Sequence, residues 1–126
     1  MLTWILLALV IYYAGVFLPP LFLLPRIGIM SYLGSRDADP DPSVHQARAE
    51  RATSNYQENL APFLGLAVLA LVVPNADMDQ AVLGAQLFVL ARLVYIPLYL
   101  IGVPVVRSAA FIAGFVGLII MGLALV

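Results

Sequence analysis

The 126-residue chain contains no cysteine, no lysine and a single histidine, His45. Without cysteine the protein has no disulfide, no thiolate metal site and no cysteine nucleophile. Any thiol chemistry must therefore use a thiol brought by a substrate. One histidine is too few for a histidine-based metal cluster, so we expect no metal ion, and we assign His45 no role.

Charged residues are also scarce. They make up 10% of the chain, hydrophobic residues make up 63%, and the mean hydropathy is +1.03. An ordinary soluble domain carries about 25% charged residues. The composition therefore predicts a polytopic membrane protein in contact with lipid, and we expect no nucleic-acid partner.

Four stretches predict helices long enough to cross a hydrocarbon core of about 30 Å. They cover about residues 2–24, 44–73, 78–101 and 105–126. The second has a polar N-terminal half, which must project into the headgroup region or into a protein cleft. We expect an all-α, polytopic four-helix bundle that forms one membrane domain over residues 1–126.

Proline and capping residues set the expected helix boundaries. Pro19 and Pro20 are expected to kink the first helix, which needs neighbouring helices to satisfy the freed carbonyls, and Pro25 is expected to end it. Capping patterns at Ser43 and Asp77 start the second and third helices. In the last helix small residues offer a surface for close packing: Ala110, Ala113, Gly114 and Gly117.

The arginines predict the orientation in the membrane. The loop between the first two spans, with its helical extensions, holds Arg26, Arg36, Arg48 and Arg51, and Arg107 lies next to the turn between the last two. The turn between the second and third spans has no cation. By the positive-inside rule both arginine-bearing loops face the cytoplasm, and both termini lie on the other side.

The second helix begins with a polar face. At 100° per residue, five polar side chains fall within about a quarter-turn of one another on this face. They are Arg48, Arg51, Asn55, Glu58 and Asn59. A second stripe follows on the third helix: Phe88, Arg92, Tyr95 and Tyr99. With Arg107 in the first turn of the fourth helix, these groups gather at one membrane face.

These residues are similar to a known family. The matching pattern is Arg51-Ala52-x-x-Asn55-x-x-Glu58, then Pro62-Phe63, then Ala91-Arg92-x-x-Tyr95-x-x-x-Tyr99, and last Arg107-Ser108. It resembles the MAPEG superfamily, the membrane-associated proteins in eicosanoid and glutathione metabolism, and within it the microsomal glutathione transferases. The resemblance implies a homotrimer with a glutathione site between adjacent subunits.

The resemblance also implies roles for single residues. It places Arg51, Asn55 and Glu58 on the glutathione backbone, with Tyr95 and Tyr99 contributing from the third helix. Arg107 matches an arginine that several members use to hold the glutathione sulfur as thiolate. One departure is Asn59, where some members have tyrosine.

The chemistry of glutathione agrees with this set of residues. The tripeptide has two carboxylates and one ammonium group, so a site needs arginines, a carboxylate and amides. Arg48, Arg51, Glu58, Asn55 and Asn59 supply them. A free thiol has a pKa of about 8.5, and a nearby guanidinium lowers it. The hypothesis is a transferase or peroxidase in which the thiolate attacks a lipophilic electrophile or reduces a lipid hydroperoxide.

Each assignment has a structural alternative. Arg51 and Glu58 can form a structural ion pair, and Arg92 can pair with Glu50 or Glu58 of a neighbouring helix. Tyr95 and Tyr99 can belong to an interfacial aromatic belt, and Arg107 can anchor its helix at the headgroups. The superfamily also includes the non-enzymatic five-lipoxygenase-activating protein. The alternative function is therefore a non-catalytic scaffold that binds lipid.

Overall fold

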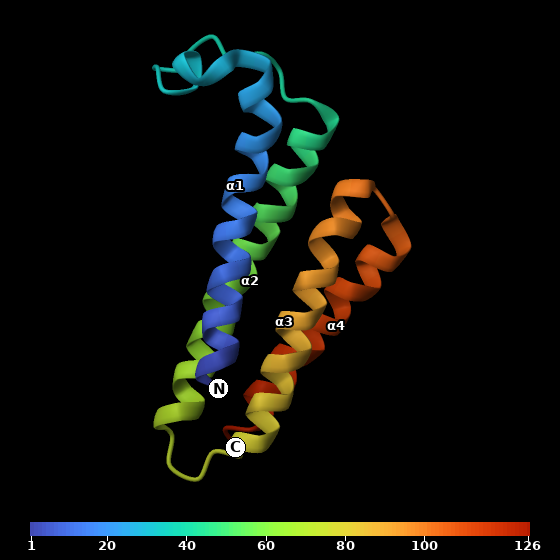
Figure 1. Ribbon diagram of the computed structural model, residues 1–126. Coiled ribbons are helices and arrows are strands. Elements are labelled where there is room, and N and C mark those ends of the chain that lie inside the picture. The colour runs from blue at the N-terminus through green and yellow to red at the C-terminus, as the bar shows by residue number, and fades with distance from the viewer.

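The computed structural model describes all residues, 1–126, as four helices joined by short connections. The helices are α1 (Leu2–Tyr32), α2 (Val44–Val72), α3 (Met78–Ile101) and α4 (Pro104–Leu123). They alternate in direction, so both termini lie at the same end of the molecule (Figure 1). The predicted all-α four-helix architecture is confirmed.

The capping residues begin the helices as the sequence predicts. Ser43 Oγ accepts a hydrogen bond of 3.2 Å from the Gln46 backbone N–H at the start of α2. At the start of α3, Asp77 Oδ1 accepts one of 2.9 Å from the backbone N–H of Gln80. Pro104 occupies the first turn of α4, where its missing N–H leaves no bond unmade.

The end of α1 differs from the expectation. The sequence predicts that the first helix ends at Leu24 because Pro25 follows, whereas helical structure continues to Tyr32. The break lies at Gly28, which has φ 76° and ψ 160°. Proline removes one hydrogen bond but keeps a helical φ, whereas glycine accepts a positive φ without a Cβ clash. The chain therefore bends at Gly28, near the end of α1 that lies away from the termini (Figure 1).

Side chains of α2 satisfy carbonyl groups of α1. Pro19 has no N–H to donate to the Gly15 carbonyl one turn earlier, and the hydroxyl of Thr53 donates to this oxygen at 2.8 Å. The buried Tyr56 hydroxyl donates to the Ala8 carbonyl at 2.7 Å. The expectation that neighbouring helices satisfy carbonyls freed by proline is confirmed at Gly15.

The Thr53 contact has a testable consequence. Replacing Thr53 by valine leaves the Gly15 carbonyl without a donor, and we expect a loss of about 1–3 kcal/mol in the free energy of unfolding. In a Pro19→Ala background the helix supplies its own N–H, so the same replacement is expected to cost less. Thermal unfolding of the four proteins of this cycle in detergent measures the difference. Equal losses in both backgrounds would show that Thr53 does not compensate for Pro19.

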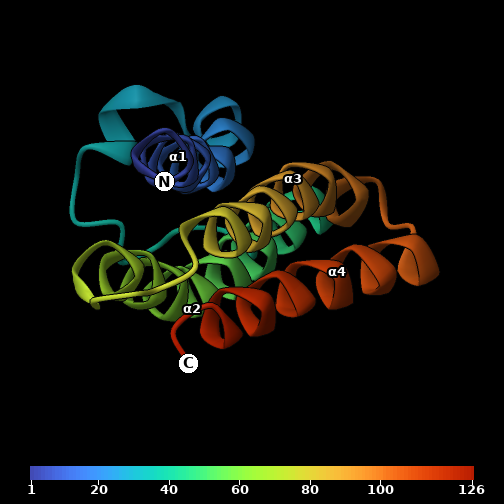
Figure 2. The ribbon, with the colours of Figure 1, turned by 90° about the horizontal axis from the view of Figure 1, so that it is seen from below.

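The core lies mainly on α2 and α3, each of which contacts all three other helices (Figure 2). The largest fully buried side chains of the protein are Arg92, Tyr56, Phe63, Phe88 and Met121. Helices α3 and α4 are in close backbone contact at Gly84 and Gly117, both of them buried. On α4 the small-residue surface is confirmed at Gly114 and Gly117, whereas Ala110 and Ala113 are only partly buried.

Three of the helices, α1, α3 and α4, are long and apolar enough to cross a membrane. Helix α2 is not among them, although it has 29 residues, because its N-terminal half is polar. Many large apolar side chains of the three apolar helices face outward. Such a surface is suited to lipid contact.

Candidate functional site

Two adjoining hollows lie where the polar half of α2 meets the C-terminal end of α3 and the start of α4. The α2–α3 hollow has a volume of about 280 Å³, and its lining is Arg51, Ser54, Asn55, Glu58, Tyr95 and Tyr99. The α3–α4 hollow has about 370 Å³, and its lining is Tyr95, Tyr99, Arg107, Ser108, Phe111 and Ile112. Because both are lined by Tyr95 and Tyr99, the two hollows are neighbours, and together they are lined by residues of three helices.

The two tyrosines connect the hollows. Their ring centres are 5.6 Å apart, and Tyr95 also lies 6.4 Å from the ring of Phe111 on α4. The guanidinium carbon of Arg107 lies 4.4 Å from the Tyr99 ring centre, within the range of a cation–π contact. This contact holds the Arg107 side chain over the shared part of the two hollows.

The charged groups of Arg51 and Glu58 form no ion pair within the chain. The one ion pair within the chain joins Arg36 to Asp39, so the structural pairing of Arg51 with Glu58 does not form. Glu58 accepts a long hydrogen bond of 3.4 Å from the Ser54 hydroxyl. Both charged side chains are exposed at the hollow and available to a ligand.

Arg92 is fully buried and is not paired with a carboxylate of this chain. Its Nη1 donates a hydrogen bond of 2.9 Å to Oδ1 of Asn55. The interpretation of Arg92 as a partner of Glu50 or Glu58 is therefore wrong within the chain. The reason is position, because Arg92 faces the Asn55 turn of α2, whereas Glu58 lies on its exposed side.

A family model matches residues 1–126, the whole chain. The chain belongs to the MAPEG family. This family includes glutathione-dependent transferases and peroxidases. With its three apolar helices, the MAPEG chain is an integral, multi-pass membrane protein. No curated protein and no solved structure matches it.

Two residues of the predicted site line neither hollow of this MAPEG protein. Arg48 Nη1 donates to the Leu100 carbonyl at 3.1 Å, and its guanidinium lies where a Cβ at Gly102 would come within 2.8 Å. Asn59 Nδ2 donates to the Asn55 carbonyl on its own helix at 2.8 Å. Both side chains share the helix face with Arg51, but nearby backbone carbonyls occupy them.

Four lining residues were not among the predicted site residues: Ser54, Ser108, Phe111 and Ile112. A spacing signal exists for two of them. Ser54 lies three residues after Arg51 and four before Glu58, and Phe111 lies four residues after Arg107, so each shares a helix face with a predicted residue.

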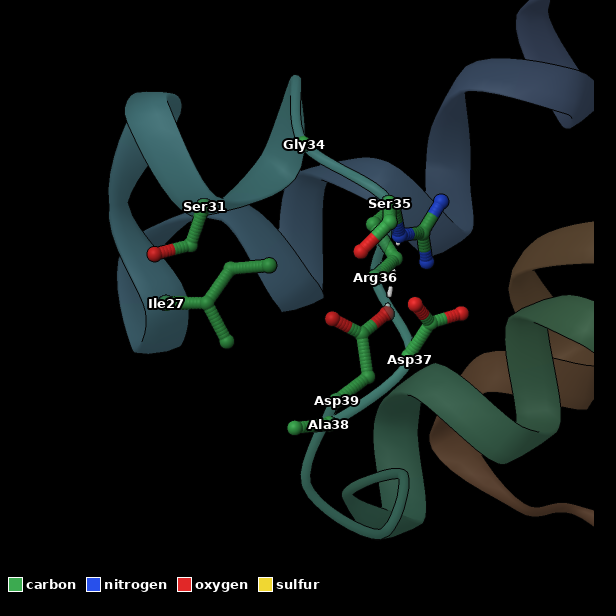
Figure 3. A pocket seen from close by; sticks show the side chains of 8 residues that line it. All are labelled: Ile27, Ser31, Gly34, Ser35, Arg36, Asp37, Ala38 and Asp39. Atoms are coloured by element: carbon green, nitrogen blue, oxygen red, sulfur yellow. Dashed lines mark hydrogen bonds and ion pairs between the residues drawn. The ribbon is translucent and has the colours of Figure 1, made fainter.

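The first loop contains a separate hollow of about 440 Å³ (Figure 3). Its charged lining is Arg36, Asp37 and Asp39, and Arg36 Nε is paired with Asp39 at 2.8 Å. Arg26 is also occupied, since its Nη1 donates to the Asp41 carbonyl at 2.9 Å. An anionic ligand meets two carboxylates here and one neutralised arginine, which makes this hollow the weaker candidate in the MAPEG chain.

Proposed function

We propose that this MAPEG protein is a glutathione-dependent transferase or peroxidase that acts on lipophilic electrophiles or lipid hydroperoxides. One observation carries the proposal. Arg51, Asn55 and Glu58 from α2 line a hollow with Tyr95 and Tyr99, and the same tyrosines line the adjoining hollow that contains Arg107.

The α2–α3 hollow has the groups that glutathione needs. Arg51 offers a bidentate contact to a carboxylate, and Glu58 offers an acceptor for the ammonium group. Asn55 and the two tyrosine hydroxyls supply neutral hydrogen-bonding groups for the peptide units. The two hollows together are lined by two arginines and one glutamate, a balance that favours a ligand of net negative charge.

Arg107 is the catalytic residue in this proposal. Bound glutathione supplies a thiol able to conjugate an electrophile or reduce a hydroperoxide. Arg107, held against the Tyr99 ring in the first turn of α4, lowers the pKa of that thiol by stabilising the thiolate. Phe111 and Ile112 border Arg107 with apolar surface, which suits a lipophilic second substrate arriving from the bilayer.

We further propose a homotrimer in which an adjacent subunit completes each site, with the site facing the cytoplasm. The exposure of Arg51, Ser54 and Glu58 supports the first point, because a second chain can cover these side chains. The placement of five of the six arginines on the two predicted cytoplasmic loops and their helical extensions supports the second.

The second candidate function is a non-catalytic scaffold that binds lipid. An apolar hollow of about 340 Å³ between α1 and α3 favours it. The lining is Ile11, Ala14, Gly15, Leu18, Leu93, Ile96, Pro97 and Leu100. This hollow has no charged side chain, so it suits an acyl chain and not a tripeptide.

Titration calorimetry with glutathione, using the full-length protein in detergent or nanodiscs, tests the proposal. We expect the wild type to bind and Arg51→Ala to bind at least about tenfold more weakly, since a hydrogen-bonded charge contact is worth about 1.5–3 kcal/mol. Arg36→Ala is the matched control, because it removes the same charge from the first loop. Absence of glutathione binding by the wild type, together with retention of a fluorescent fatty acid, would favour the scaffold.

A further inference from the structure

Arg92 is a buried cation with one hydrogen bond. Its side chain is 0% exposed, and only Nη1 has a partner, while Nε and Nη2 have none. Three aromatic rings surround the guanidinium carbon, with ring centres 4.9 Å away at Phe111, 5.3 Å at Phe88 and 5.4 Å at Tyr95. These contacts hold the cation without a counterion, leaving the Asn55 amide as its sole polar contact.

The fourth helix leaves space for this arrangement. At Gly114 a Cβ would lie 3.3 Å from Arg92 Nε and 3.6 Å from its guanidinium carbon. Because glycine has no Cβ, α4 can pack directly against the Arg92 guanidinium at Gly114. The orientation of Arg92 is therefore determined by packing from α3 and α4, before any contact with α2 is considered.

A guanidinium donates hydrogen bonds and accepts none. The Asn55 amide must therefore turn its oxygen toward Arg92, because the flipped amide would place its NH₂ group against an N–H donor. The side chain of Asn55 makes no other hydrogen bond, and this half-buried residue lines the α2–α3 hollow. Its NH₂ group is thus left to donate to a ligand.

We infer that Arg92 is a positioning residue that fixes the Asn55 amide as a hydrogen-bond donor in the α2–α3 hollow. The inference rests on the proposed function, since the ligand is glutathione. With its NH₂ group facing the hollow, Asn55 would donate to a carbonyl or carboxylate oxygen of the tripeptide. Arg92 itself touches neither the ligand nor the reacting sulfur.

The sharpest test is Asn55→Asp. This change keeps an oxygen facing Arg92, now with a charge that pairs with the guanidinium, but it replaces the donor by an acceptor. We expect thermal stability equal to or above that of the wild type and glutathione affinity at least about tenfold weaker, the loss of one hydrogen bond plus repulsion between acceptors. Unchanged glutathione affinity in a stable Asn55→Asp protein would overturn the inference.

A double-mutant cycle tests the role of Arg92 separately. Arg92→Gln removes the donor-only partner, because glutamine either donates or accepts and no longer selects one amide orientation. If Arg92 acts through Asn55, Asn55→Ala weakens glutathione binding in the wild-type background but adds little in the Arg92→Gln background. Additive losses in the dissociation constant, or an Arg92→Gln protein of lowered stability with unchanged glutathione affinity, would assign Arg92 a purely structural role.

The two proposals fail in different ways. If wild-type protein does not bind glutathione, the proposed function is wrong and the inference is overturned with it. If the wild type binds glutathione and the Asn55→Asp protein binds it equally well, only the inference is overturned.

Discussion

Replacing Arg107 by alanine is expected to reduce kcat for conjugation of an aryl halide by about 10²–10³-fold, the usual effect of removing one group that stabilises developing or full negative charge. Arg107 lies over the Tyr99 ring and belongs to the α3–α4 hollow, whereas the residues proposed to hold the tripeptide line the α2–α3 hollow. The variant is therefore expected to bind glutathione with nearly wild-type affinity. Steady-state kinetics and calorimetry on the same preparation separate the two effects.

The pH dependence gives the Arg107→Ala experiment a second readout. If Arg107 lowers the pKa of the bound thiol as proposed, the wild-type rate levels off below the pKa of free thiols, which is about 8.5. Without the guanidinium the pKa of the thiol returns toward that of a free thiol. The rate of the variant is therefore expected to keep rising with pH through this value. A kcat unaffected by the substitution, or parallel pH profiles, would leave Arg107 as a headgroup anchor.

The second large effect is expected where the backbones of α3 and α4 are in close contact. A Cβ at Gly117 would lie 2.6 Å from the Gly84 carbonyl oxygen and 2.8 Å from the Phe88 backbone nitrogen. Both are backbone atoms that cannot rotate away, so Gly117→Ala must push the helices apart. We expect a loss of about 3 kcal/mol in the free energy of unfolding, the upper end of the usual cost of overpacking. Activity should fall as well, because Tyr99 and Arg107 lie on the two separated helices.

Gly65→Ala is the matched control for Gly117→Ala. Gly65 is an exposed glycine of α2 with no atom within 4 Å of its added Cβ. Because alanine favours a helix over glycine by about 0.5–1 kcal/mol, this variant is expected to be as stable as the wild type or slightly more stable. Thermal unfolding in one detergent compares the three proteins. Equal unfolding temperatures for Gly117→Ala and wild type would show that the contact between α3 and α4 accommodates a Cβ at position 117.

Much of the fold follows from local sequence. Ser43, Asp77 and Pro104 begin helices through contacts within one turn, and such contacts depend on spacing along the chain. The residues that line the site also follow from helical periodicity, since Arg51, Asn55 and Glu58 share one face of α2. The wrong expectation at Pro25 arose because proline weakens a helix without ending it, while Gly28 tolerates the positive φ of the bend.

Helical periodicity places a side chain on a face, but it does not say which atom of another helix will meet it. Arg48 lies on the same face as Arg51, yet the Leu100 carbonyl takes its donor, and Asn59 is bonded to a carbonyl of its own helix. A glutamate partner was the structural alternative for Arg92, which instead meets Asn55 among rings from α3 and α4. These partners depend on how α2, α3 and α4 pack together, because hydrogen bonds between helices depend on distances that a single helix does not specify.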